Sequence, residues 1–202
     1  MSFKTKKYQI IRGALSKERA NFFFNYMMLQ RDSVDFMVKH QKVNPYNPFI
    51  GTREDKQVPG AYSKYADWIM ETLLMYMIPI MKANTGLDLI PTYTYTRLYE
   101  KGNILRRHKD RPSCEISTTL HLGGDEWPIF LDPTGADNAP TGISINLKVG
   151  DMLVYSGCDL EHWREPFKGD NCAQVFLHYN NIDGPFGTKN KFDHRPLLGI
   201  SK

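Results

Sequence analysis

Three residues in the second half of the chain could together bind a metal ion. His108 and Asp110 are separated by one residue in the run RRHKDRPS, and His162 lies in CDLEHWREPF. If residues 104–110 are extended, His108 and Asp110 point to the same face, so an imidazole and a carboxylate can reach one ion. Two histidines and one carboxylate on one side of Fe(II) leave positions open for a bidentate co-substrate and O2. We call these three residues the triad. An isolated HxD is a weak signal in a chain with six histidines, so the prediction depends on the elements that carry the triad.

Short strands are the elements expected to position the triad, and they occupy the chain from position 91 onward. Residues 92–99 alternate in a way that places four large side chains on one face of a strand: Tyr93, Tyr95, Arg97 and Tyr99. Further strands are predicted at 104–108, 115–122, 127–131, 143–147, 151–155, 160–164 and 172–179, with glycine-containing turns between them. The HxD pair thus lies at a strand end, and the second histidine lies on a later strand after a Gly-Asp turn.

Residues 1–90 have a helical pattern. After a short apolar stretch at residues 8–11, Ser16 can cap a helix over residues 17–31, and a second helix is predicted over residues 65–81. Residues 44–60 contain three prolines and two glycines and are expected to form a long loop. We expect both helices to pack on a sheet. Helices in front of about eight closely spaced strands predict an α+β fold, mainly β, built as an antiparallel sandwich or small barrel.

The composition is that of an ordinary globular protein. The chain has 202 residues, 41% of them hydrophobic, and no repeat or linker divides it, so one domain over residues 1–202 is predicted. The longest uncharged apolar run, residues 72–81, is about half of what a membrane-spanning helix needs, and the N-terminus lacks an apolar signal core. Three cysteines without a CxxC pair indicate reduced thiols. A cytoplasmic protein without a membrane partner is therefore expected.

The formal net charge of +4 is small, and part of it lies beside the HxD pair. We call this group the basic cluster; it consists of Arg106, Arg107, Lys109 and Arg111. These side chains mostly alternate away from the triad, so we expect a solvated rim that could attract an anionic substrate. The sequence has no strong basic stripe with interleaved aromatic residues, so nucleic acid is not favoured as a partner. The sequence leaves the oligomeric state open.

The ordered motifs resemble the 2-oxoglutarate/Fe(II)-dependent dioxygenases, and within them the prolyl-hydroxylase-like branch. The resemblance rests on YEKGNILRRHKDRPSCEISTTLHLGG from Tyr99 and on VGDMLVYSGCDLEHWREP from Val149. Residues 8–20 are also similar to the start of that branch. The resemblance implies a double-stranded β-helix, a jelly-roll barrel covered by helices. Residues 1–90 would then form a helical support, residues 91–180 the barrel and residues 181–202 a C-terminal tail.

The resemblance also implies roles for individual residues. The triad matches the iron ligands of the family and would carry the catalysis. Tyr99 matches a tyrosine that often faces the co-substrate. His121 falls where many relatives have a tyrosine that hydrogen-bonds the far carboxylate of 2-oxoglutarate, and alternation puts Thr119 on the same face as His121.

One departure from the family concerns the basic residue that usually holds this carboxylate. It is expected about nine to eleven positions after the distal histidine, where this chain has residues 171–173, Asn-Cys-Ala. A carboxylate inside a barrel needs a charged partner, because its unpaired burial is costly. Arg164 is the first candidate, since it shares the face of His162 one step along the strand and can bind a carboxylate through two bonds. Arg97 and Lys168 are the alternatives: Arg97 shares an inward face, and Lys168 is expected in a hairpin turn.

The resemblance implies Fe(II) as cofactor, 2-oxoglutarate and O2 as co-substrates, and hydroxylation of a C–H bond with succinate and CO2 as co-products. A prolyl residue or a free amino acid is the substrate that the branch suggests, and residues 44–63 are long enough to act as a lid. The family's halogenases lack the carboxylate of the triad, so Asp110 favours hydroxylation. Two alternatives stay open: a nucleic-acid demethylase of the same superfamily, and a non-catalytic jelly-roll module whose HxD and His are structural or bind another ion.

Structural roles are also open for several of these residues. Arg164 could pair with Glu161 or Glu165 at the surface, and His121 could be a packed core histidine. Tyr93 and Tyr95 are expected in the barrel core rather than as a base-stacking platform. Three other histidines show no partner pattern, and no role is assigned to them: His40, His178 and His194.

Overall fold

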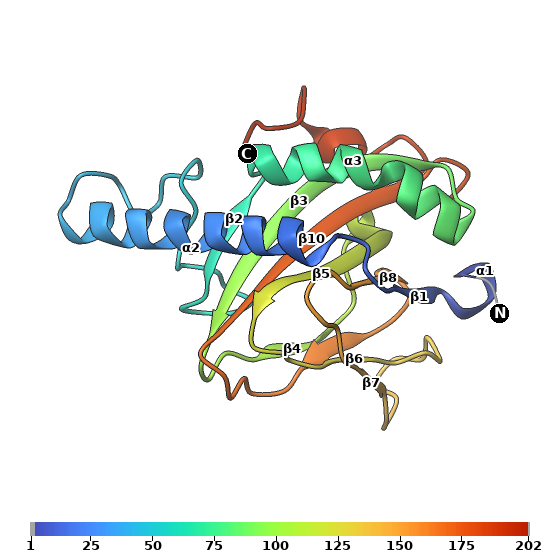
Figure 1. Cartoon of the computed structure of the whole chain (residues 1–202). Helices are drawn as coiled ribbons and strands as arrows, with labels where there is room; N and C mark the ends of the chain where they lie inside the picture. Colours follow the sequence, from blue (N-terminus) through green and yellow to red (C-terminus); the bar gives the residue numbers. More distant parts are fainter. Residues whose placement is uncertain (1–2, 202) are drawn as a thin grey trace.

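The computed structural model describes residues 3–201, which form two antiparallel β-sheets with two long helices across one of them (Figure 1). The larger sheet has the strand order β1-β8-β5-β10-β3-β2, and the smaller has the order β4-β9-β6-β7. The strands are β1 Tyr8–Ile11, β2 Tyr62–Tyr65, β3 Leu89–Glu100, β4 Leu105–His108, β5 Ile116–Gly124, β6 Ile129–Leu131, β7 Ile143–Ile145, β8 Met152–Ser156, β9 His162–Arg164 and β10 Asn171–Asn181. The helices are α1 Phe3–Lys6, α2 Lys17–Lys39 and α3 Trp68–Thr85, with short 3-10 turns at Pro112–Cys114 and Lys191–His194.

The strands predicted from position 91 onward are confirmed in their order as β3 to β10, with ends that differ by a few residues. The two sheets pack face to face through apolar side chains such as Leu131 of β6 and Leu153 of β8. Over residues 3–201 their hydrogen-bonded ladders stay separate, so the sheets are not closed into one ring. The observed architecture is therefore mainly antiparallel β with few helices.

The strands β3 and β10 form the centre of the larger sheet. They pair over their full lengths, with Arg97 opposite Gln174 and Tyr99 opposite Cys172, and β10 also pairs with β5. Because side chains alternate along a strand, β3 presents Arg97 and Tyr99 between the sheets and Leu98 to the helices. The face between the sheets is where the predicted site residues lie.

The helix α2 begins as predicted but is longer. Ser16 caps it by accepting from Arg19 N–H at 3.3 Å, and the helix continues to Lys39 instead of ending near position 31. Figure 1 shows α2 crossing the larger sheet and extending beyond its edge. Packing on the sheet is therefore partial: Met27 is buried, whereas Phe22 is 62% and Leu29 68% exposed.

The helix α3 is shifted by a few residues from its predicted range. Asp67 caps it by accepting from the N–H groups of Ile69 and Met70, and Gly86 ends it with a left-handed φ of 69°. The sequence predicted that this helix ends near position 81. It continues through Pro79 and ends at Thr85. Met77 and its neighbours pack on the outer face of the larger sheet. No helix within residues 3–201 has the length and apolarity needed to cross a membrane.

The segment before α3 contains a strand that the sequence analysis did not predict. β2 pairs with the edge of β3, with Ser63 opposite Arg97, and it occupies the end of the segment considered as a lid. The loop before it is irregular as predicted, apart from one bridge between Thr52 and Ser63. Asp55 and Val58 of this loop are buried, so part of the loop packs against the space between the sheets.

Candidate metal centre

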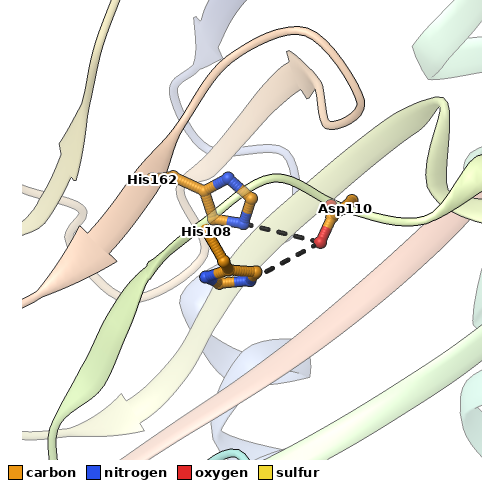
Figure 2. Close-up of side chains that lie close together, drawn as sticks. All are labelled: His108, Asp110 and His162. Carbon is orange, nitrogen blue, oxygen red and sulfur yellow. Dashed lines mark ion pairs between the residues drawn. The ribbon is translucent and has the colours of Figure 1, made fainter. Parts of the chain in front are cut away.

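The triad lies at the ends of two paired strands. His108 is the last residue of β4, His162 is the first of β9, and the two are opposite each other in the antiparallel ladder. Asp110 follows two residues after β4, where its N–H donates to Gly157 O at 2.9 Å. Figure 2 shows the two imidazoles and the carboxylate pointing toward one another. Asp110 Oδ1 lies 3.6 Å from Nε2 of each histidine.

A backbone carbonyl orients each histidine of the triad. His108 Nδ1 lies 2.8 Å from Arg106 O, and His162 Nδ1 lies 3.1 Å from Leu160 O. Because a carbonyl oxygen only accepts, each Nδ1 carries the proton, and each Nε2, 3.6 Å from Asp110 Oδ1, is left without one. Burial lowers the pKa of His162, so its imidazole is neutral at neutral pH, the form that binds metal ions.

Asp110 is ionised although it is largely buried. Burial alone raises the pKa of a carboxyl, but the nearby His162 and His178 and a hydrogen bond from Ser117 outweigh it, so the pKa of Asp110 lies below its usual value. Ser117 Oγ donates to Asp110 Oδ2 at 2.6 Å, and Oδ1 faces the two histidine Nε2 atoms at 3.6 Å. Gly157 is needed at the same place, because a Cβ there would overlap Asp110 Oδ2.

The donor atoms of the triad fit a divalent metal ion. Metal–ligand bonds of about 2.1 Å place two ligands at right angles about 3 Å apart. In this structure each histidine Nε2 is 3.6 Å from Asp110 Oδ1, and the three ligand atoms lie within 4.8 Å of one another. A small inward movement of these side chains would close them around an ion. Gln57 Nε2 also lies 2.9 Å from His108 Nε2. An imidazole Nε2 has one lone pair, so this hydrogen bond and a metal bond exclude each other.

Arg164 is a buried cation next to the residues predicted on β5. Its side chain is 1% exposed and donates to Trp127 O and to Thr119 Oγ1, the latter at 3.3 Å. The alternative that Arg164 pairs with Glu161 or Glu165 at the surface is wrong, because Arg164 is buried. Glu161 pairs with Arg107 instead, and Glu165 Oε1 accepts a hydrogen bond from Trp163. In the described part of the chain, Arg164 Nε has no hydrogen-bond partner. A buried guanidinium with unused donors is suited to binding an anion.

His121 lies in the same part of the interior. Its Nδ1 is 3.0 Å from Gln174 Nε2, and Gln174 Oε1 accepts from Thr119 Oγ1 at 2.9 Å. Burial and the positive charge of Arg164 lower the pKa of His121 to about 4, so it is neutral at pH 7. Thr119 and Arg164 are thus in contact, and His121 is linked to Thr119 through Gln174.

Arg97, Tyr99 and Lys168 have different surroundings. Arg97 forms an ion pair with Asp55 at 2.5 Å and donates to Tyr99 Oη at 3.1 Å. Tyr99 is fully buried, and its hydroxyl is next to this guanidinium. Lys168 is exposed in the turn between β9 and β10, as the sequence predicted. Of the three basic candidates, Arg97 is paired with Asp55 and Lys168 is exposed to solvent. Arg164 is buried, and among residues 3–201 its Nε has neither a hydrogen-bond partner nor contact with solvent.

Comparison with solved structures identifies the fold. A Pseudomonas putida prolyl-4-hydroxylase aligns over 89% of this chain and 95% of its own, with a TM-score of 0.59 and 16% identity. HygX from Streptomyces hygroscopicus with nickel, 2-oxoglutarate and hygromycin B bound aligns over 90% and 85%, with a TM-score of 0.65 and 11% identity. The viral collagen prolyl hydroxylase vCPH from Paramecium Bursaria Chlorella virus-1 aligns over 87% and 97%, with a TM-score of 0.55 and 12% identity. The chain has the fold of the 2-oxoglutarate/Fe(II) oxygenases. No family model and no curated protein sequence matches it.

Within this oxygenase fold, a cavity of about 190 Å³ opens onto the triad. Its wall also contains Arg97, as the alternation in β3 predicted, whereas Tyr99, Thr119, His121 and Arg164 are buried outside this wall. The sequence analysis did not single out several other residues of the wall: Asp55, Gln57, Leu105, Ile129, Tyr155, Phe176 and His178. Inward alternation along β10 was the one signal for Phe176 and His178, and nothing local pointed to Asp55 and Gln57.

His178 belongs to a second group of potential ligands beside the triad. Its Nδ1 lies 3.0 Å from Ser117 Oγ, and its ring packs on Tyr93. Asp110, Cys114 and His178 have ligand atoms within 4.8 Å of one another. This group shares Asp110 with the triad, and Cys114 Sγ is 3.0 Å from Tyr93 Oη, so we regard it as support for the triad.

The basic cluster beside the HxD turn is largely paired with acidic residues. Its pairs are Arg107 with Glu161 and Asp132, Lys109 with Asp137, and Arg111 with Asp193. Arg106 is exposed. The expected solvated rim is therefore a set of ion pairs, which weakens the attraction of an anionic substrate to this surface.

Proposed function

We propose that the chain is a non-haem Fe(II), 2-oxoglutarate-dependent oxygenase that hydroxylates a C–H bond. The observation that carries this proposal is the triad, in which two proton-free Nε2 atoms and one carboxylate oxygen face a common point. Such a ligand set on one side of Fe(II) leaves positions open for a co-substrate and O2. The shared fold with 2-oxoglutarate/Fe(II) oxygenases supports the same assignment.

Iron bound at the triad would supply the oxidative chemistry, with succinate and CO2 as co-products and one oxygen atom transferred to the substrate. The residues of the chain hold and orient the reactants. The carbonyls of Arg106 and Leu160 keep the imidazoles in the metal-binding tautomer, and Ser117 keeps Oδ1 of Asp110 available. By its resemblance to the family, Asp110 would supply the carboxylate that the family's halogenases lack, which favours hydroxylation.

The far carboxylate of 2-oxoglutarate is assigned to Arg164 and Thr119. Arg164 is buried beside Thr119 Oγ1 and has unused donor capacity at Nε. A guanidinium binds a carboxylate through two parallel hydrogen bonds, and the low dielectric of the interior strengthens them. His121 is neutral and close to Arg164, so it adds hydrogen-bonding capacity without competing for charge.

The two sheets are assigned to one double-stranded β-helix, and residues 1–202 to a single oxygenase domain with residues 1–90 as helical support. The substrate is assigned to a prolyl residue or a free amino acid, following the resemblance to the prolyl-hydroxylase-like branch. The ion pairs of the basic cluster do not support a nucleic-acid demethylase, because paired cations attract a phosphate backbone weakly.

Anaerobic addition of Fe(II) and 2-oxoglutarate tests the proposed function. We expect a weak visible charge-transfer band, because the 2-oxo acid end of the co-substrate would bind iron directly. His108→Ala should abolish the band, whereas His40→Ala, at the exposed end of α2, should keep it. No band in the wild-type protein, or an unchanged band in His108→Ala, would favour a non-catalytic module instead.

A further inference from the structure

A buried pair of opposite charges lies on the wall of the cavity that contains the triad. Arg97 of β3 and Asp55 of the loop before β2 are 4% and 8% exposed, and Arg97 Nη2 lies 2.5 Å from Asp55 Oδ2. Both residues line the cavity together with His108 and Asp110. The pair is therefore accessible to a molecule bound at the triad.

Hydrogen bonds hold the pair in place on both sides. Tyr95 Oη donates to Asp55 Oδ2 at 3.0 Å, and Arg97 donates to Gln57 Oε1 at 2.9 Å and to Tyr99 Oη at 3.1 Å. Burial of two charges costs more than a well-packed apolar pair of similar size in many proteins, so such a pair is a weak device for stability alone. A pair that faces a cavity has a second use, which is to recognise a ligand with complementary charges.

Part of the remaining cavity wall is apolar and suits a small apolar group, and the rest consists of Gln57, Tyr93, Tyr95, Tyr155 and His178 beside the triad. Leu105, Ile129 and Phe176 line the cavity near the triad. The volume of about 190 Å³ is at the scale of a small molecule and leaves little room for an extended peptide. A ligand that fits this wall carries two opposite charges and an apolar body, and the Phe176 ring, 5.8 Å from Arg97 Cζ, lies where the two parts meet.

We propose that Asp55 and Arg97 bind the ammonium and the carboxylate of a free α-amino acid with an apolar side chain. The side chain lies against Leu105, Ile129 and Phe176, where one of its C–H bonds is presented to the triad. This inference rests on the proposed function: one oxygen atom of O2 enters the C–H bond, and 2-oxoglutarate takes the other and loses CO2 to become succinate. An internal residue of a peptide carries neither charge, so the pair discriminates against it.

The first experiment compares free L-amino acids that have apolar side chains with their Nα-acetyl amide derivatives. Oxygen uptake and succinate formation are measured with Fe(II) and 2-oxoglutarate, and the product mass is checked for one added oxygen atom. We expect at least one free amino acid to be hydroxylated, and its derivative to react at least tenfold more slowly. Hydroxylation of the derivative alone, or of no member of the panel, would overturn the inference.

The second experiment removes one charge of the pair. Asp55→Asn keeps the size of the side chain and can still accept from the N–H groups of Gln57 and Val58 through Oδ1, but it loses the charge at Oδ2 that would face an ammonium. We expect it to raise the KM for the free amino acid by about 10- to 100-fold, as for a lost charged hydrogen bond. Glu54→Gln removes the same charge from an exposed neighbour in the same loop and should leave this KM unchanged.

The preference for the free amino acid over its derivative separates recognition from a structural role. If Asp55 only anchors the loop, Asp55→Asn lowers the rates with both compounds equally, and the inference is wrong. If it recognises the ammonium, the preference for the free amino acid falls. The anaerobic charge-transfer band of the wild-type protein is measured in parallel: its absence contradicts the proposed function, whereas its presence with an unreactive panel contradicts only this inference.

Discussion

At the scale of single residues, Arg164 is expected to control the affinity for 2-oxoglutarate. Arg164→Ala should weaken 2-oxoglutarate binding to the Ni(II)-loaded protein by about 100-fold, because hydrogen bonds to a charged group contribute about 1.5–3 kcal/mol each. Arg164→Lys keeps the charge but not the two-bond geometry and should lose less. Titration calorimetry measures both, with the exposed Lys168→Ala as the control.

The same measurement separates the alternative basic residues. An unchanged affinity in Arg164→Ala, with a loss in Arg97→Gln, would assign the carboxylate of 2-oxoglutarate to Arg97. That result would also remove Arg97 from the proposed amino-acid site. A loss of 2-oxoglutarate affinity in Lys168→Ala would mean that the turn between β9 and β10 reaches the co-substrate, although Lys168 is exposed in this structure.

Ser117 is a positioning residue for the triad. Its hydroxyl donates to Asp110 Oδ2 at 2.6 Å, so Ser117→Ala should weaken binding of Ni(II) by about tenfold, the usual effect of removing the hydrogen-bond partner of a metal ligand. Thr118→Ala removes a hydroxyl that faces the other side of β5 and should leave metal affinity as in the wild type. Equal metal affinities in Ser117→Ala and the wild type would contradict this role.

At the scale of elements, the loop between α2 and β2 is expected to compete with the metal. Gln57 donates to His108 Nε2 at 2.9 Å, the atom that would bind the ion. Gln57→Ala should therefore tighten Ni(II) binding by about fivefold, the effect of removing one competing hydrogen bond of about 1 kcal/mol. Pro59→Ala loosens the same loop at an exposed position. If Pro59→Ala tightens binding as much, loop opening rather than the hydrogen bond is responsible.

The elements also show where local sequence patterns are sufficient. The alternation in residues 92–99 depends only on the pleat of one strand, and it correctly predicted the shared face of Tyr95, Arg97 and Tyr99. Both helices continue beyond their predicted ends: α3 packs along the outer face of the larger sheet, whereas the last turns of α2 extend beyond the edge of that sheet. The four residues of β2 show no strong strand pattern in the sequence. They form a strand because they pair with β3 along its free side, a contact that depends on the tertiary structure.

At the scale of the whole molecule, stability is expected to depend on pH through His121. Burial and the charge of Arg164 lower the pKa of His121 to about 4 in the folded protein, whereas an unfolded histidine has a pKa of about 6.5. Between these values the unfolded chain binds more protons, so the free energy of unfolding decreases as the pH falls. The contribution of His121 amounts to about 2 kcal/mol between pH 6.5 and pH 4.5.

Urea denaturation of the metal-free protein at these two pH values measures the effect. His121→Gln should show a smaller loss of stability on acidification than the wild type, because an amide does not titrate in this range. His40→Gln, at the exposed end of α2, should lose as much as the wild type. Equal losses in His121→Gln and the wild type would show that the buried imidazole does not oppose protonation.

The sequence by itself predicted the succession of eight strands along the chain, the three candidate residues of the triad and the inward face of β3, because residue type and alternation over a few positions indicate each of them. The tertiary structure decided which of Arg97, Arg164 and Lys168 is buried near Thr119, since burial depends on how the sheets pack. It also brought Asp55 and Gln57 from a loop about 40 to 50 residues away in sequence to the cavity wall. Contacts over such separations depend on the fold as a whole, and local patterns do not encode them.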